Sequence, residues 1–296
     1  MKRIAITGAN SSVGKNLLTR IAQGTDFEAL AGVRSESVIP SLPDSDHITA
    51  RTISYDAIEE LTEAFQGYQV VVHLAGILIE NRYSRYQSAN VDATAAVIKA
   101  AKQAGVNELV FISVVGADRH SANPYFRSKG EAEALIEESG LTARIIRTPL
   151  LLGPDTAGAR SVLWSASQPK AKLLGGGNYT MNPLDVDDLS RAVLNCCRAM
   201  QAGTRTLELV GPEGILYRDL ITRLAAMRGN DITIASVPIW SAKLGAAIGS
   251  RIKGGGITPA VIDVITTDET VTHNSAEELG VTLTPLQKTL EKILEQ

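Results

Sequence analysis

Two residues of the chain, Tyr125 and Lys129, have types and a spacing that could transfer a proton. On a helix, a separation of four residues places the phenol and the ammonium on one face. An ordinary tyrosine has a pKa of about 10. A neighbouring ammonium and an oxidised nicotinamide favour the phenolate, so we expect the pKa of Tyr125 to be lowered. The phenol could then exchange a proton while a nicotinamide exchanges a hydride.

A serine stands where it could assist this pair. Ser113 ends a predicted strand at residues 108–113, and the predicted helix that carries Tyr125 and Lys129, at residues 125–139, follows it. The serine hydroxyl would orient the oxygen of a substrate, and Lys129 would also hold the nicotinamide ribose. We therefore predict that Ser113, Tyr125 and Lys129 are the catalytic residues.

A glycine turn near the start of the chain could bind a phosphate. Gly8 follows a predicted strand at residues 3–7, and Gly14 lies in the first turn of a predicted helix at residues 13–23. Free backbone amides at a helix start attract a pyrophosphate, Gly8 permits the tight turn, and Gly14 permits close packing. Ser11 occupies the place of the usual middle glycine, although Ser11 and Ser12 could donate to phosphate. The alternative is a turn that serves geometry only.

Two further residues could select the cofactor. Arg34 ends the second predicted strand, about 20 residues beyond Gly14, where an NAD-selective site has an acidic residue. A guanidinium there favours NADP(H) through a forked contact with the 2′-phosphate, with NAD(H) as the second choice; the alternative is a surface arginine. Asp56, after the predicted third strand, could bind the adenine amino group or cap the helix predicted at residues 58–65.

The elements that must position these residues alternate along the chain. Strands are predicted at residues 3–7, 28–33, 48–54, 69–73, 108–113 and 143–148, with helices between them. This order predicts an α/β fold, a Rossmann doubly wound parallel sheet, whose ligands lie beyond the carboxyl ends of the strands. His73, at one of these ends, is expected to be a packed residue rather than a catalyst.

The second half of the chain is predicted to form a smaller carboxyl-terminal α+β substrate lobe. We expect an NADP(H)-binding domain at residues 1–155, with a return segment at about 178–200, and a lobe made of residues 156–177 and 201–296. Tyr83, Tyr86 and the stretch at residues 152–169 could form walls for a small-molecule substrate. Asp185, Asp187 and Asp188 are interpreted as a helix start, and no metal site is predicted.

Four motifs follow one another along the chain: TGxxxxxG from residue 7, HLAG from residue 73, the strand-ending serine, and YxxxK from residue 125. Together they resemble the short-chain dehydrogenase/reductase superfamily. The short gap between Ser113 and Tyr125, with the later segments RTPLLLGP and PLDVDDLSRAV, resembles its atypical or extended branch. That branch includes the NAD(P)H-binding accessory subunit of respiratory complex I and proteins labelled sugar-nucleotide epimerase-like. The resemblance covers residues 1–199 well and the remainder loosely.

The resemblance implies roles for residues at matching positions. One group would line the pyrophosphate: Gly8, Asn10, Ser11, Ser12 and Val13. A second group would follow the rest of the cofactor: Arg34 at the 2′-phosphate, Leu74, Ala75 and Gly76 behind it, and Thr148 and Leu151 beside the nicotinamide. It also implies Ser113, Tyr125 and Lys129 as the catalytic triad. Two positions depart from the family pattern, since Ser11 replaces a glycine and Thr148 a proline.

Composition excludes some partners and compartments. A net charge of -3 gives no basic field for nucleic acid, and no apolar run is long enough to span a bilayer. Cys196 and Cys197 are adjacent and cannot join distant segments, so we expect packing residues in a cytoplasmic protein.

The segment at residues 237–252 repeats apolar residues every four positions. It could rest on a membrane or a partner protein, but burial within the lobe is the favoured interpretation.

Three functions fit these residues. The first is an NADP(H)-dependent oxidoreductase that acts on a carbonyl or hydroxyl compound, with Tyr125 as the acid/base. The second is a non-catalytic NAD(P)H-binding assembly or redox-sensing protein, which in this branch commonly lacks the tyrosine or lysine. The third is a sugar-nucleotide epimerase or dehydratase that recycles its cofactor. Retention of both Tyr125 and Lys129 favours catalysis.

Overall fold

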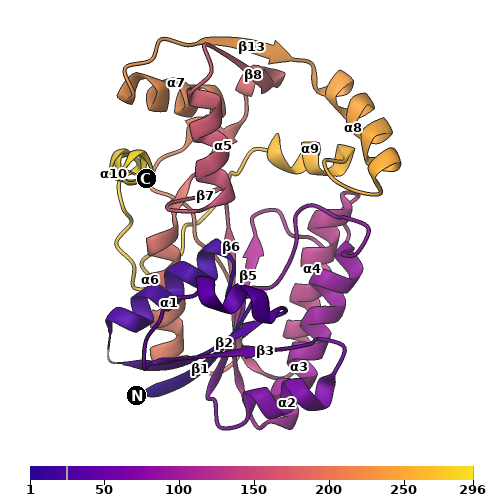
Figure 1. The fold of residues 1–296 in the computed structure, drawn as a ribbon, viewed down its shortest axis with the longest axis vertical. Helices are drawn as coiled ribbons and strands as arrows, with labels where there is room; N and C mark the ends of the chain where they lie inside the picture. The colour runs from indigo at the N-terminus through magenta and orange to yellow at the C-terminus, as the bar shows by residue number, and fades with distance from the viewer. Residues whose placement is uncertain (25, 296) are drawn as a thin grey trace.

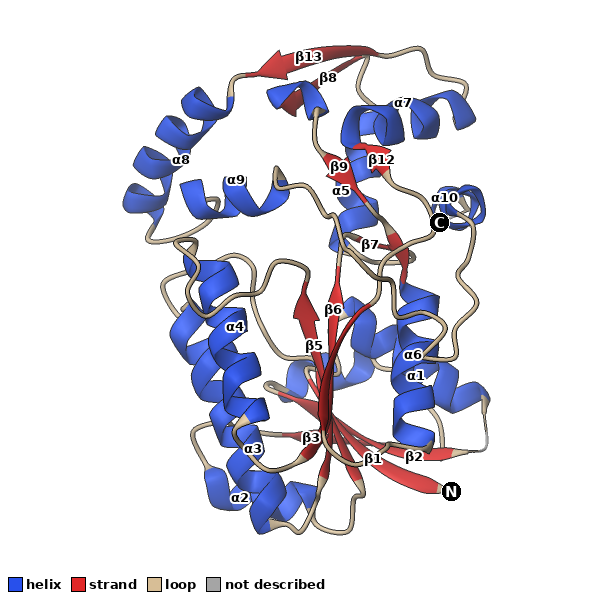
Figure 2. Ribbon diagram, turned by 180° about the vertical axis from the view of Figure 1, so that it is seen from behind, coloured by secondary structure: helices blue, strands red, loops and turns tan. Residues whose placement is uncertain are grey.

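A seven-stranded parallel sheet forms the centre of the computed structural model, which describes residues 1–24 and 26–295 (Figures 1 and 2). Every neighbouring pair of strands in this sheet is parallel. In spatial order its strands are β3 (Ile48–Thr52), β2 (Phe27–Val33), β1 (Lys2–Thr7), β4 (Val70–His73), β5 (Glu108–Val114), β6 (Thr142–Thr148) and β11 (Thr204–Glu208). The predicted Rossmann fold is confirmed.

Helices cover both faces of this sheet. One face carries α1 (Ser12–Gln23) and α6 (Val186–Arg198), and α6 lies within the predicted return segment at about 178–200. The other face carries α2 (Ile58–Phe65), α3 (Ala93–Gln103) and α4 (Pro124–Glu137). The two groups of helices lie on opposite sides of the strands in Figure 1. The strands buried between them are rich in Val and Ile, as a sheet covered on both faces requires.

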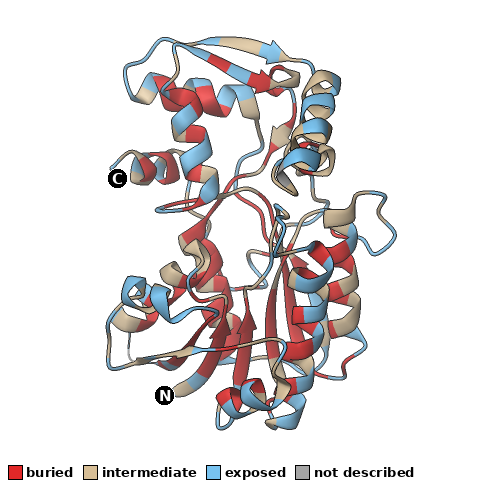
Figure 3. Cartoon of the chain, turned by 45° about the vertical axis from the view of Figure 1, so that its right-hand side comes forward, coloured by how far each residue is buried: buried red, intermediate tan, exposed pale blue. Residues whose placement is uncertain are grey.

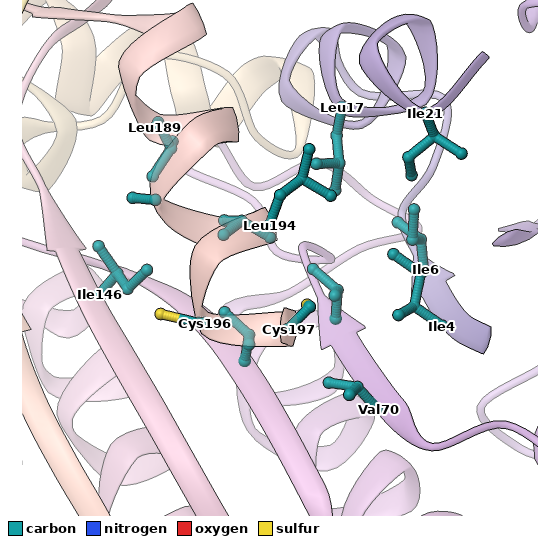
Figure 4. Close-up of a cluster of buried hydrophobic side chains, with 14 of the residues drawn as sticks. Ile4, Ile6, Leu17, Ile21, Val70, Ile146, Leu189, Leu194, Cys196 and Cys197 are labelled. Atoms are coloured by element: carbon teal, nitrogen blue, oxygen red, sulfur yellow. The ribbon is translucent and has the colours of Figure 1, made fainter. Parts of the chain in front are cut away.

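The packing of α6 onto the sheet is visible in Figure 4. Leu189 and Leu194 of α6 belong to the same buried cluster as Leu17 of α1, and Leu194 lies near Leu17 in this view. Cys196 and Cys197 are free, buried thiols in the same cluster, and burial raises the pKa of Cys196 to about 11. They are packing residues, as expected.

A second layer of elements lies beyond the carboxyl ends of the strands. Its core joins α5 (Ala157–Ala166), α7 (Tyr217–Met227) and α10 (Leu286–Leu294). Three two-stranded pairs complete it: β8 (Lys170–Leu174) with β13 (Thr233–Val237), β9 (Thr180–Met181) with β12 (Ile215–Leu216), and β7 (Leu151–Leu152) with β10 (Leu184–Asp185). Strand β11 instead joins the central sheet, so the sheet takes in part of the segment that the sequence assigned to the substrate lobe.

Short helices occupy several connections. They are the 3₁₀ helices η1 (Glu36–Ser41) and η3 (Gly175–Gly177) and the π-helix η2 (Gln87–Asp92). Asp185 caps α6 by accepting a hydrogen bond from the Asp187 amide at 2.9 Å, so the acidic cluster is a helix start. Among the described helices, none is both long and apolar enough to cross a membrane.

The helix predicted from about residue 240 corrects one expectation. It is α8 (Ile239–Lys253), which packs on α9 (Pro259–Ile265), a helix that the sequence analysis did not predict. The apolar residues that recur along it, Trp240, Leu244, Ile248 and Ile252, are exposed rather than buried in the lobe. Figure 3 shows α8 at the edge of the molecule with no buried stripe. These four side chains are not buried because α9 packs against a different side of α8.

Candidate active site

Two cavities meet at the carboxyl ends of the parallel strands. One, of about 430 Å³, lies between the sheet and the second layer, and the other, of about 550 Å³, lies over β2 and β3. Both are lined by Leu74, Ala75 and Gly76, which directly follow β4. We call them the substrate-side cavity and the nucleotide-side cavity. Because they share these residues, the cavities adjoin and form one cleft at the strand ends, the place where doubly wound sheets bind dinucleotides.

The glycine turn forms one wall at the junction of the cavities. Gly8 has φ +71°, and a Cβ there would lie 2.9 Å from the Ala75 backbone nitrogen, so only glycine fits. A Cβ at Gly14 would overlap the Ala9 carbonyl, which explains how α1 starts so close to β1. Ser11 caps α1 by accepting a hydrogen bond from the Gly14 amide at 3.0 Å. The turn therefore has the geometry that a bound pyrophosphate needs.

The predicted nucleotide residues face one cavity. Gly8, Asn10 and Ser11 line the nucleotide-side cavity together with Arg34 and Asp56. Asp56 does not cap α2, because the cap residue is Ala57 and no side chain bonds there. Among the described residues, the exposed Arg34 guanidinium has no hydrogen-bond or ion-pair partner. It is thus available for an anion.

The three predicted catalytic residues line the substrate-side cavity, with Ser12, Thr148 and Leu151. The register of the sheet sets Val114 of β5 against Thr148 of β6, so Ser113 and Thr148 emerge at neighbouring strand ends. The Ser113 hydroxyl is buried and has no hydrogen-bond partner among residues 1–24 and 26–295. A buried polar atom without a partner is costly, so this oxygen fits a site where a bound oxygen supplies the missing bond.

Lys129 is fixed beneath the cavity by its surroundings. Its Nζ donates to the Ile112 carbonyl at 2.8 Å and lies 4.1 Å from the centre of the Phe111 ring. Burial lowers the pKa of Lys129 to about 8, so at neutral pH the ammonium form still predominates. The helix cap of α4 orients the pair, because Asn123 accepts a hydrogen bond from the Tyr125 amide at 3.0 Å.

Burial governs the acidity of Tyr125. The pKa of Tyr125 is raised by burial and, to a smaller extent, by Tyr86, whose ring centre lies 5.8 Å away. The lowering that the sequence analysis expected from Lys129 together with an oxidised nicotinamide concerns the complex with the cofactor and stays a prediction. The desolvation of the phenolate outweighs the attraction of the ammonium, so the protein alone keeps Tyr125 as a phenol.

His73 is a structural residue, as predicted. It is fully buried, its Nδ1 lies 2.7 Å from the Thr7 hydroxyl, and its Nε2 lies 3.1 Å from the Thr94 hydroxyl. Because Thr94 donates to the Asn90 carbonyl, it accepts from the Nε2 proton. Burial and nearby Lys129 lower the pKa of His73 to about 3, so the ring stays neutral.

Asn90 was missed by the sequence analysis. It lies in the π-helix η2, is buried, and binds both backbone groups of Ile77 as well as the Ser128 hydroxyl. A Cβ at Gly76 would lie 3.1 Å from the Asn90 Oδ1. Asn90 therefore fixes the loop after β4 at the junction of the two cavities. A π-helix often marks a functional site. Asn90 was missed because the sequence analysis used no pattern that predicts a π-helix.

The sequence analysis also missed Glu269. Among the described residues that line the substrate-side cavity, it is the one with an acidic side chain. Its carboxylate accepts hydrogen bonds from the Leu150 amide at 2.7 Å and the Asn182 amide at 3.1 Å. Burial raises the pKa of Glu269 to about 7 against the effect of these bonds. Its sequence position, after α9, gave no signal, because tertiary folding brings it to the cavity.

Some predicted residues lie elsewhere. Val13 lines neither cavity and instead packs against the core on the α1 face. Tyr83 is exposed at the rim of the nucleotide-side cavity. Tyr86 is buried behind Tyr125, and its hydroxyl donates to the Leu78 carbonyl at 2.7 Å. The predicted wall at residues 152–169 does contribute, through Thr156 and its neighbours in α5.

The fold and the cleft define a nicotinamide-nucleotide-binding protein with a Rossmann sheet. The family described as NAD(P)H-binding matches residues 8–177, more than half of the chain, and the chain belongs to this family. The short-chain dehydrogenase/reductase superfamily indicated by the sequence motifs agrees with this match.

Known proteins extend the comparison. The chain is 24% identical over 235 residues to the ceramide reductase of Caulobacter vibrioides, covering 79% of this chain and 73% of that protein. It is 24% identical over 193 residues to the mouse NADH dehydrogenase 1 alpha subcomplex subunit 9, covering 63% and 51%. The UDP-glucose 4-epimerase of Thermotoga maritima has the same fold, with a TM-score of 0.77 at 16% identity, over 99% and 97% of the two chains.

Proposed function

We propose that the chain is an NADP(H)-dependent reductase of an uncharged, largely apolar carbonyl compound. The observation that carries this proposal is the substrate-side cavity, where the Ser113 hydroxyl, without a partner, lines the same space as Tyr125 and Lys129. The nucleotide-side cavity continues from it over the glycine turn. The cleft thus has room for a dinucleotide and for a substrate beside it.

Each residue has a distinct task in this proposal. A bound nicotinamide would supply a hydride to the carbonyl carbon. Ser113 donates a hydrogen bond to the carbonyl oxygen, and Tyr125 gives its phenolic proton to the same oxygen. Lys129, whose ammonium is held by the Ile112 carbonyl, stabilises the resulting phenolate.

The lining of the substrate-side cavity supports an apolar substrate. Most of its side chains are apolar, and its charged lining residues among those described are Lys129 and Glu269. Lys129 is already bonded to the Ile112 carbonyl, and Glu269 supplies no positive charge for a phosphate. A nucleoside diphosphate has no cationic partner there. This favours the reductase activity in the printed name of the Caulobacter relative over sugar-nucleotide epimerisation.

Arg34 supports NADP(H) as the cofactor. Its guanidinium lines the nucleotide-side cavity after β2, with no bonded partner among the described residues, where a 2′-phosphate would lie. Asp56 and the Asn10 side chain line the same cavity and could bind the adenosine. A guanidinium gives a forked bond to phosphate that a ribose hydroxyl cannot match.

The test compares wild type with Tyr125→Phe. We expect the wild type to oxidise NADPH in the presence of a long-chain ketone, followed by absorbance of the reduced nicotinamide. Tyr125→Phe should lower turnover by about 10²-fold or more, because the proton donor is lost. The affinity for NADPH, followed by nicotinamide fluorescence, should stay unchanged.

Two outcomes would overturn the proposal. Turnover of a nucleotide sugar without net NADPH oxidation would identify an epimerase. Tight NADPH binding with no turnover in a broad ketone and aldehyde screen, and no difference between wild type and Tyr125→Phe, would identify a non-catalytic nucleotide-binding protein.

A further inference from the structure

We propose that α8 is a docking surface for an anionic lipid bilayer. The surface consists of Trp240, Leu244, Ile248 and Ile252 of α8 with Ile257 after it, and we call it the α8 patch. All five side chains are among the exposed large apolar residues of the described chain, with exposed fractions from 56% to 81%. A monomeric protein rarely exposes apolar residues in one contiguous row.

The spacing of the apolar residues along α8 explains why they form a row. Its four α8 members are spaced by four residues, so they share one side of the helix, while α9 packs on another side. An ion pair between Lys243 and Asp263 of α9 joins the two helices. Figures 1 and 2 both show α8 on the outer edge of the molecule with α9 inside it. The apolar side is therefore turned away from the protein.

Charge indicates which partner covers the α8 patch. The sequence of α8 contains lysine and arginine but no aspartate or glutamate, although the whole chain has a net charge of -3. Arg251 is exposed beside Ile252 and has no acidic partner among the described residues. Arg82 is also exposed and adjoins the end of α8, where its Cβ faces Gly254. Apolar side chains flanked by basic residues match an anionic lipid surface.

Neighbouring elements extend the α8 patch toward the cleft. The Gly256 amide donates to the Glu80 carbonyl at 2.8 Å, which ties the end of α8 to the loop that carries the exposed Ile79 and Tyr83. Val264 and Ile265 of α9 line the substrate-side cavity. A bilayer at the α8 patch would lie next to the apolar cavity, so an apolar substrate could enter from lipid; this last step rests on the proposed function.

Two exposed tryptophans make the test specific. Trp240 lies in the α8 patch and is 71% exposed, whereas Trp164 lies in α5 and is 65% exposed. Trp164→Phe leaves Trp240 as the one tryptophan, and Trp240→Phe leaves Trp164 as the matched control. Each full-length variant is titrated with vesicles of equal parts phosphatidylcholine and phosphatidylglycerol, and with vesicles of phosphatidylcholine alone.

We expect a blue shift of the Trp240 emission on anionic vesicles and none of the Trp164 emission. Binding should weaken on phosphatidylcholine alone and at high salt, because the basic residues contribute. Adding Leu244→Ser and Ile248→Ser to Trp164→Phe should weaken vesicle binding by about tenfold or more. Unchanged NADPH binding confirms that this variant is folded, since both positions are exposed.

Other outcomes overturn the proposal. Equal shifts of both tryptophans, or none, would show that the α8 patch does not enter lipid. A dimer in sedimentation velocity that Leu244→Ser with Ile248→Ser dissociates, without vesicle binding by wild type, would assign the surface to a second copy of the chain. None of these readouts needs turnover, so failure of the proposed reaction leaves the docking test intact.

Discussion

At the residue scale, desolvation decides the chemistry of the cleft. Burial raises the pKa of Tyr125 although Lys129 follows it by one helical turn, and burial lowers the pKa of Lys129 itself to about 8. The Ser113 hydroxyl is buried, and the described part of the chain offers it no hydrogen-bond partner. The Ser113 hydroxyl is thus free to bond an oxygen of a bound molecule, which would offset the cost of burying it.

Arg34 should select the nucleotide. We expect Arg34→Ala to weaken NADPH binding by about tenfold or more while NADH binding changes little, because only NADPH carries the 2′-phosphate. Nicotinamide fluorescence titrations measure both affinities. Arg228→Ala, at an exposed arginine far along the chain in sequence, controls for the change in net charge. Equal losses for both nucleotides would contradict the assignment of Arg34.

Glu269 should make stability depend on pH. Its folded pKa is about 7, whereas an unfolded glutamate titrates at about 4.3. Between these values the folded protein retains a proton that the unfolded chain has lost, so the free energy of unfolding falls as the pH rises. Glu269→Gln removes this effect, and its stability relative to wild type should increase by roughly 1 to 3 kcal/mol between about pH 5 and about pH 8.

Chemical denaturation at both pH values measures that difference. Glu59→Gln changes an exposed glutamate of α2 and serves as the matched control. A relative stability of Glu269→Gln that stays flat with pH would mean that Glu269 titrates as an ordinary surface carboxyl.

At the element scale, the start of α1 joins stability to binding. Ser11 ends the tight turn, caps the helix and lines the nucleotide-side cavity. Gly14 lets the helix approach Ala9 without a side chain between them. The replacement of a glycine by Ser11 is therefore compatible with the motif, because its hydroxyl accepts the Gly14 amide at the helix end.

Loss of this cap should destabilise the protein. Ser11→Ala should lower the free energy of unfolding by about 1 kcal/mol, because the Gly14 amide loses its acceptor. Ser12→Ala is the control, since Ser12 is the first residue of α1 and makes no capping bond. Denaturant unfolding without nucleotide measures both, and equal losses would show that the cap contributes little.

At the scale of the whole molecule, α10 connects the second layer to α6, which packs on the central sheet. Lys292 of α10 binds Asp185 at 2.7 Å and Asp187 at 2.8 Å, at the start of α6. Leu286, Leu290 and Ile293 of α10 are buried in the core that includes α5 and α7. The chain end thus stabilises the wall of the substrate-side cavity.

Removal of the Lys292 ammonium should lower the free energy of unfolding. The Asp185 side chain is fully buried, so Lys292→Met leaves a buried carboxylate without its cation and should cost roughly 1 to 3 kcal/mol of stability. Lys288→Met, at an exposed lysine of the same helix, should change stability by less than about 0.5 kcal/mol. Thermal and denaturant unfolding compare them, and similar values for both would argue against a role for Lys292.

The sequence by itself determined the Rossmann sheet and most of the cleft. Strand and helix periodicity reports local burial, and residues that end parallel strands must meet at one edge of the sheet. For this reason Gly8, Arg34, Ser113 and the helix carrying Tyr125 could be placed from their positions alone. The raised pKa of Tyr125 in the protein alone could not be read from the sequence, since desolvation depends on the surrounding packing.

Only the tertiary structure decided what faces the cleft from distant parts of the chain. Glu269 and Asn90 reach it through α9 and a π-helix, for which the chain has no local pattern that we recognised. The tertiary structure also decided that the apolar side of α8 is exposed. An amphipathic repeat shows that a helix has an apolar side, but which side another element covers depends on how the whole chain packs.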